Sequence, residues 1–171
     1  MNSYDIPYKQ TNKFSNLVND YIAKHENLAP FVNHFPSLEN FEKQIIEKSK
    51  HQIDRSNLVA VLEKQNASLA LSDLSDKNIQ ALKLEQTYTV TTGHQLCLFT
   101  GPLYFIYKII STLNLAEQLA EQYPNNNFVP VFWMATEDHD FQEVNHVNIF
   151  GKKISWDSKQ KGAVGRMNLE G

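Results

Sequence analysis

Two polar clusters in this sequence combine residue types that take part in acid-base and ligand-binding chemistry. The first is Thr92-Gly93-His94-Gln95, and the second is Glu137-Asp138-His139-Asp140. A histidine can act as a general acid or base near neutral pH, and paired carboxylates can share a proton, bind an ammonium group or hold a divalent ion. We therefore interpret both clusters as candidate parts of an enzyme site.

The segment after the first cluster adds a candidate anion site. Gly93 would let the backbone turn sharply where a Cβ could clash with a ligand. Thr100 and Gly101 precede a predicted helix, whose free N–H groups suit a phosphate or carboxylate. The spacing matches neither a P-loop nor a dinucleotide-binding fingerprint. The alternative is that both glycines serve turn geometry only and that His94 is a structural loop histidine.

The second cluster leaves a metal site open. If a helix begins near Asp140, then His139, Glu143 and His146 fall on one face at spacings of four and three, which is typical of metal ligands. A metal-dependent hydrolase is therefore one alternative function. The structural alternative is that Asp138 or Asp140 caps a helix and that His146 is an ordinary polar residue.

Each cluster directly follows a segment that is typical of a buried β-strand, residues 88–91 and 129–134. Residues 102–121 lie between them and have the periodicity of an amphipathic helix. Strand, helix and strand predict a parallel βαβ unit, so both clusters should emerge at the same edge of the sheet. Ligands of open α/β sheets bind outside that edge, which makes this convergence the main argument for an enzyme.

The remaining chain is predicted to be helical up to residue 86, with Ser37, Asp54 and Ser75 as helix starts, and to form strands at 147–150 and 154–156. The fold class is therefore α/β. Two parallel strands are too few for a stable sheet. We expect this chain to be an N-terminal piece of a longer protein, or to be completed by a partner.

Composition excludes several classes. Sixteen basic against nineteen acidic residues give a formal charge of −3, which lacks the basic stripe of a duplex nucleic-acid binder. The longest apolar run, residues 128–135, is too short to span a membrane, and we find no signal-peptide pattern at the N-terminus. A single cysteine, Cys97, fits a reducing compartment. We expect a cytoplasmic protein that binds neither nucleic acid nor membrane.

Taken together, the motifs resemble the bacillithiol biosynthesis cysteine-adding enzymes, a family of cysteine ligases. The likeness is dense between residues 90 and 146, and the segment 162–166 also fits. It is carried by Thr92-Gly93-His94-Gln95, Phe99-Thr100-Gly101-Pro102-Leu103-Tyr104, Tyr107-Lys108, Pro130-Val131-Phe132-Trp133, Glu137-Asp138-His139-Asp140-Phe141, Glu143, Asn145 and His146.

The resemblance implies a Rossmann-like core over residues 87–150 after a helical region over residues 1–86. Residues 151–171 would begin an inserted connecting segment, and a coiled coil would follow in a longer protein, which is a candidate homodimer. Such proteins attach cysteine to the amine of glucosaminyl malate. The core resembles that of class I aminoacyl-tRNA synthetases, so ATP is the suspected cofactor.

The same resemblance assigns roles to single residues. His94 and Gln95 would occupy the phosphate-stabilising loop, with Gly93, Thr100 and Gly101 holding an anionic group. Asp138 or Glu137 would orient an amine, and His139 would take its proton. Asp140 and His146 complete the candidate binding residues. A third alternative is a helical interaction module without catalysis, and we expect the 171-residue chain alone to be inactive.

Overall fold

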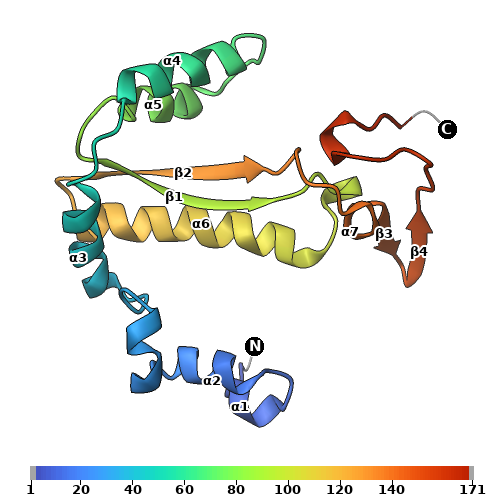
Figure 1. The fold of residues 1–171 in the computed structure, drawn as a ribbon, viewed down its shortest axis with the longest axis horizontal. Helices are drawn as coiled ribbons and strands as arrows, with labels where there is room; N and C mark the ends of the chain where they lie inside the picture. The colour runs from blue at the N-terminus through green and yellow to red at the C-terminus, as the bar shows by residue number, and fades with distance from the viewer. Residues whose placement is uncertain (1–2, 170–171) are drawn as a thin grey trace. The chain divides into compact units, whose positions relative to one another are not determined.

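The computed structural model describes residues 3–169. It divides the chain into two compact units, one up to Gln52 and one from Ile53 onward. Figure 1 labels the helices and strands of both units.

The first unit is helical. It contains α1 (Tyr8–Thr11), α2 (Asn16–Ile22), the 3-10 helix η1 (Glu26–Phe31) and α3 (Leu38–Lys48). Ser37 caps α3 as predicted, because its side chain accepts a hydrogen bond from Asn40 N. None of the described residues of this unit is fully buried, and Phe31 is 85% exposed. These short helices therefore have no core of their own.

The second unit contains the sheet and the helices that cover it. Its elements are α4 (Arg55–Asn66), α5 (Asp73–Ala81), β1 (Thr87–His94), η2 (Leu98–Thr100), α6 (Leu103–Gln122), β2 (Asn127–Met134), α7 (Phe141–Val144), β3 (His146–Ile149), β4 (Lys152–Ser155) and η3 (Val164–Arg166).

The centre of this unit is the predicted parallel βαβ arrangement. Strands β1 and β2 pair in parallel, from Thr87 opposite Asn127 to His94 opposite Met134. Helix α6 connects them and packs along both strands. In Figure 1, α6 lies on one side of the two strands, and α4 and α5 lie on the other. The sheet therefore has a helical layer on each face, as in α/β folds.

Helices α4 and α5 belong to the sheet's unit because their apolar side chains pack against it. Val59 of α4, Leu82 and Val129 of β2 form the buried cluster. The Arg55 guanidinium adds hydrogen bonds to the carbonyl oxygens of Leu82, Glu85 and Thr87, at 3.0 to 3.1 Å. The compact units consequently divide at residue 52, so α4 and α5, the last helices before β1, belong to the same unit as the sheet.

Two local details differ from the sequence-based expectation. Helix α5 begins at Asp73, because the side chain of Ser72, and not that of Ser75, caps it by accepting from Ser75 N. Helix α6 begins at Leu103, with Pro102 in the capping position. The predicted second pair of strands is present as the antiparallel hairpin of β3 and β4.

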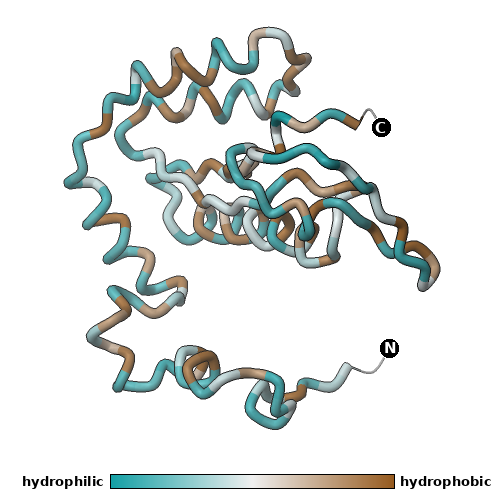
Figure 2. Tube along the Cα trace, turned by 45° about the vertical axis from the view of Figure 1, so that its right-hand side comes forward, coloured by the Kyte–Doolittle hydropathy of each residue, from teal (hydrophilic) through white to brown (hydrophobic). Residues whose placement is uncertain are grey.

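Within residues 3–169, β1 and β2 form a sheet of two strands, and the hairpin is a separate sheet. Figure 2 shows hydrophobic and hydrophilic residues interleaved along the trace. No helix in this described range combines the length and apolarity needed to cross a membrane.

Candidate functional site

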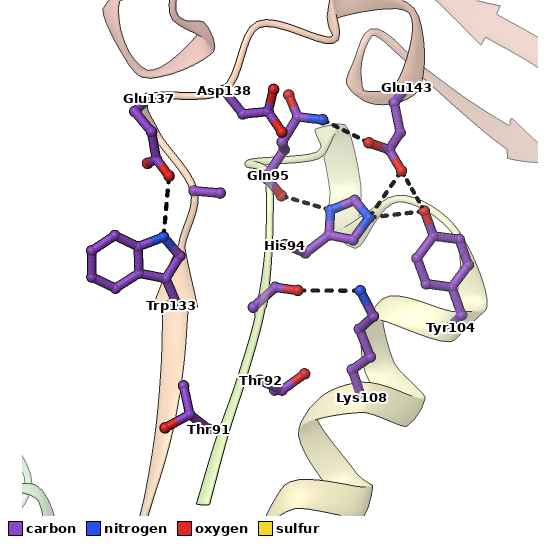
Figure 3. Close-up of a pocket in the computed structure, with 12 residues that line it drawn as sticks. Thr91, Thr92, His94, Gln95, Tyr104, Lys108, Trp133, Glu137, Asp138 and Glu143 are labelled. Carbon is purple, nitrogen blue, oxygen red and sulfur yellow. Dashed lines mark hydrogen bonds and ion pairs between the residues drawn. The ribbon is translucent and has the colours of Figure 1, made fainter. Parts of the chain in front are cut away.

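A cavity of about 550 Å³ lies at the carboxyl ends of β1 and β2 (Figure 3). Residues from both polar clusters line it, so the predicted convergence at one edge of the sheet is confirmed. The lining residues are Thr91, Thr92, Gly93, His94, Gln95, Tyr104, Lys108, Trp133, Ala135, Glu137, Asp138 and Glu143.

The cavity contains five of the ten residues that the sequence singled out: Gly93, His94, Gln95, Glu137 and Asp138. The other five lie outside its lining: Thr100, Gly101, His139, Asp140 and His146.

His94 sits at the centre of a hydrogen-bond network (Figure 3). Its side chain is only 4% exposed. Nδ1 lies 3.0 Å from the carbonyl oxygen of Gln95, and because a carbonyl oxygen only accepts, Nδ1 is the donor in this contact. Nε2 lies 2.8 Å from the Tyr104 hydroxyl and 3.3 Å from Glu143 Oε1. Both ring nitrogens are therefore engaged by protein groups.

The Glu143 carboxylate connects the members of this network. The Tyr104 hydroxyl donates to Oε1 at 2.7 Å, and Gln95 Nε2 donates to Oε2 at 2.6 Å. The hydrogen bond from Tyr104 is the main cause that lowers the pKa of Glu143, and the same bond raises the pKa of Tyr104 to about 12. At neutral pH the pair is consequently a carboxylate and a neutral phenol.

Gln95 cross-links the end of β1 to helix α7. Its side-chain Oε1 accepts from Asp140 N at 3.1 Å, while its Nε2 holds Glu143. Asp140 in turn caps α7 by accepting from Glu143 N at 3.2 Å. The structural alternative for Asp140 is thus correct, and both ends of the Gln95 amide are used within the protein.

The acidic loop after β2, which carries Glu137 and Asp138, differs from Glu143 in its side-chain hydrogen bonds. Trp133 Nε1 donates to Glu137 Oε1 at 3.3 Å, and Asp138 Oδ1 accepts from the backbone N–H of His139 at 2.7 Å. These partners are close in sequence, and each bond engages a single oxygen of its carboxylate. Glu137 and Asp138 can therefore bind a ligand group in the cavity without breaking a tertiary contact.

A segment near the C-terminal end of the described range supports this loop. Val164 N donates to the carbonyl oxygen of Asp138 at 2.8 Å, and Gly165 N donates to that of Thr136 at 2.9 Å. A Cβ at residue 165 would lie 2.5 Å from Thr136 Cβ, so only glycine allows this close approach.

Lys108 provides the positive charge of the site. Its Nζ donates to the carbonyl oxygen of Gly93 at 3.2 Å and lies 5.4 Å from the centre of the Tyr104 ring. Among the described residues that line the cavity, it is the one lysine or arginine. The lining also contains three acidic residues: Glu137, Asp138 and Glu143.

The sequence analysis gave no site role to Tyr104, Lys108 or Trp133, although they belong to the motifs of the family resemblance. It considered Glu143 only as a metal ligand. A signal for two of them exists: Tyr104 and Lys108 are four residues apart in the first turns of α6, so they share a face of the helix. That end of the crossover helix lies beside the carboxyl end of β1, which is the site's edge of the sheet.

The metal arrangement considered as an alternative is not formed. Helix α7 spans only Phe141–Val144; His139 precedes it, and His146 begins β3. The side chain of His139 is 82% exposed. Within residues 3–169 no three His, Cys, Asp or Glu side chains are grouped to hold a metal ion, so the hydrolase alternative has no geometric basis.

Packing constrains both glycines of the expected anion site. Gly101 has a φ of 59°, and a Cβ there would lie 2.5 Å from Cys97 Cβ, so packing against Cys97 requires the glycine. Gly93 belongs to β1, where a Cβ would lie 2.8 Å from the carbonyl oxygen of Trp133. Close packing therefore accounts for a glycine at both positions. Burial raises the pKa of the Cys97 thiol, as expected for a packed cysteine.

Comparison with known proteins identifies the family. Residues 1–171 match the family described as bacillithiol biosynthesis BshC, N-terminal Rossmann-like domain. This chain belongs to the BshC family. The resemblance and the Rossmann-like α/β fold that it implied are confirmed.

Several curated relatives carry the name "Putative cysteine ligase BshC". The protein of Flavobacterium johnsoniae is 52% identical over 168 residues, which cover 97% of this chain and 32% of the relative. That of Flavobacterium psychrophilum is 53% identical over 168 residues, which cover 96% of this chain and 32% of the relative. A Bacillus cereus (strain Q1) relative is 36% identical over 137 residues, which cover 80% of this chain and 25% of the relative. The chain thus spans about a third of the length of the relatives most similar to it among these.

Proposed function

We propose that this BshC domain works within a longer cysteine ligase. In this reaction the carboxyl carbon of cysteine is joined, as an amide, to the amine of glucosaminyl malate. The proposal is supported by the family membership and by one observation above all: residues from the ends of β1 and β2 line a single cavity at the edge where α/β folds bind ligands.

The charges of the cavity suggest how the substrates are oriented. An amine arrives at neutral pH as an ammonium ion, and Glu137 and Asp138 carry carboxylate oxygens free to receive it. The Lys108 ammonium bonds one carbonyl oxygen and can donate further hydrogen bonds to an anionic group. We assign the amine to the acidic loop and the carboxylate or phosphate to the Lys108 side.

A nucleotide, which we propose to be ATP, would supply the activation that makes the cysteine carboxyl carbon reactive. Lys108 and Thr92 line the same cavity and offer an ammonium and a hydroxyl group, which are suitable donors for a phosphate. Asp138 and Glu137 would hold the amine near the acyl carbon, and one of these carboxylates would accept the proton that the ammonium must lose before its nitrogen attacks. The carboxyl oxygen that the nitrogen replaces would leave with the phosphate-containing group that activated it. His139 lies outside the cavity, so we assign it no role in this proposal.

The other expectations from the family resemblance remain part of the proposal. The protein would act in the cytoplasm on small molecules, and the length beyond this domain would include a coiled coil. A homodimer is the proposed assembly.

The test uses the full-length protein with cysteine, glucosaminyl malate and ATP, and detects the conjugate by mass spectrometry. Wild type is expected to form the product, and an H94A/D138A double variant is expected to lose most of it. An H51A/D76A double variant, which replaces the same residue types at exposed positions, is the matched control. Wild type without product, or an unimpaired H94A/D138A variant, would reject the proposal.

Two additions sharpen this test. Thermal unfolding of each variant separates lost activity from lost folding, since His94 is buried. Omitting ATP is expected to abolish product, which tests the nucleotide separately. The 171-residue chain alone is expected to be inactive because its parallel sheet has two strands, and turnover by it would contradict this expectation.

A further inference from the structure

Glu143 lies where three separate elements meet. It belongs to α7, Tyr104 belongs to α6, and His94 ends β1 with Gln95 directly after it. Its two oxygens receive hydrogen bonds from Tyr104 and Gln95, and His94 Nε2 lies 3.3 Å from Oε1. Figure 3 shows these side chains pointing toward one another. Both carboxylate oxygens are thus occupied by protein groups, unlike those of Glu137 and Asp138.

Exposure differs among the connected side chains. The side chain of His94 is 4% exposed and Gln95 as a residue is also 4% exposed, whereas Tyr104 is 43% exposed and lines the cavity. A substrate in the cavity can therefore reach the Tyr104 hydroxyl more readily than either nitrogen of the His94 ring.

The hydrogen-bond directions determine what Tyr104 can do. Its single hydroxyl proton points to Glu143 Oε1 at 2.7 Å, and His94 Nε2 lies 2.8 Å from the phenol oxygen. One lone pair of that oxygen remains for a third partner. This partner must be a donor, such as a hydroxyl group of a sugar.

We propose that Glu143 is a positioning residue that acts through Tyr104: it holds the phenol so that its oxygen accepts a hydrogen bond from a hydroxyl group of the bound glucosaminyl malate. This inference rests on the proposed function for its substrate. The contact of Tyr104 with Glu143 itself does not depend on that function.

The first experiment compares the full-length E143Q, Y104F and E143Q/Y104F variants with wild type, in kcat and KM for glucosaminyl malate. Each single change is expected to lower kcat/KM about 10- to 100-fold, the factor for a hydrogen bond that involves a charged group. Because both substitutions remove the same contact, kcat/KM of the double variant should be no lower than that of the more impaired single variant. The exposed Glu121 of α6 supplies the control, E121Q, which should match wild type.

The second experiment measures Tyr104 without any turnover. Tyrosine labelled with ¹³C at Cζ reports its titration by NMR in the full-length protein, and the Y104F variant assigns the signal. The pKa of about 12 in wild type is expected to fall toward 10 in E143Q, because the carboxylate that receives the proton is gone. An unchanged Tyr104 titration would overturn the positioning role.

The outcomes separate the two proposals. Wild type that makes no conjugate rejects the proposed function, while the titration still decides whether Glu143 positions Tyr104. Wild type that makes conjugate, with E143Q equally fast, rejects the positioning role alone. Loss of thermal stability in E143Q with unchanged kcat/KM would also overturn it, because Glu143 would then be merely structural.

Discussion

Replacing Gln95 with alanine should release helix α7 from the end of β1. The Gln95 side chain is buried, with the residue 4% exposed, and its amide bridges two groups of the α7 region. Nε2 donates to Glu143 Oε2 at 2.6 Å, and Oε1 accepts from Asp140 N at 3.1 Å. Alanine removes both bonds at once and leaves the backbone N–H of Asp140 without this acceptor.

The size of the effect follows from the two bonds. A hydrogen bond to a charged group contributes about 1.5–3 kcal/mol, and a neutral one about 0.5–1.5 kcal/mol. Their loss should lower the free energy of local opening of α7 by about 2–4.5 kcal/mol. Amide hydrogen exchange in α7 would then become about 30- to 2,000-fold faster.

Hydrogen exchange followed by mass spectrometry on the full-length protein measures this directly, in the peptide that contains residues 140–145. The control is Q80A, since Gln80 of α5 is half-buried and its side chain bonds Glu63 of α4 at 2.8 Å, with no bond to α7 within residues 3–169. Q80A should leave exchange in α7 unchanged. If α7 of the Q95A variant exchanged at the wild-type rate, the cross-link would not hold this helix and the reasoning would be refuted.

Three further predictions concern packing and pH. G93A places a Cβ 2.8 Å from the carbonyl oxygen of Trp133. Because overpacking costs about 1–3 kcal/mol, the Tm of the full-length protein should fall. A G93A variant with the wild-type Tm would contradict the close strand packing. G165A brings a Cβ to 2.5 Å from Thr136 Cβ, so the acidic loop should shift and conjugate formation should drop, which product mass spectrometry checks. The folded-state pKa of Glu143 is lowered, so its stabilising contribution is complete above its ordinary value of 4.5 and is lost as pH falls through the lowered value. Thermal unfolding against pH should therefore show a smaller acid-induced fall in Tm for E143Q than for wild type. Identical Tm profiles would contradict the stabilising role of the Glu143 carboxylate.

The main elements of the second unit could be predicted because their signals are local. Apolar β-branched and aromatic runs mark β1 and β2, and periodic apolar residues mark α6. Because the two strands run parallel, both polar clusters emerge at one edge of the sheet, which the register of His94 opposite Met134 confirms. Side-chain caps such as Ser37 and Asp54 were readable for the same reason.

The network around Glu143 could not be predicted in this way. Its partners Tyr104 and Gln95 are 39 and 48 residues away in sequence, and no periodicity reports such contacts. Tyr104 has the pattern of an ordinary helix residue until the end of β1 is placed beside it.

The metal hypothesis failed because a tertiary contact overrode a helical spacing. His146 pairs with Ser155 in the β3–β4 hairpin, and the Asn145 side chain bonds the carbonyl oxygen of Trp156 at 3.2 Å. These contacts end α7 after four residues, so the spacing of His139 and His146 no longer describes one helix face.

A crystal structure of the full-length protein with bound glucosaminyl malate tests the central claim most directly, namely that the ends of β1 and β2 form one substrate cavity. We expect the amine of the ligand within hydrogen-bonding distance of Asp138 or Glu137, and a hydroxyl group of its sugar within that distance of the Tyr104 hydroxyl. A ligand bound at a site that includes none of these residues would contradict the claim.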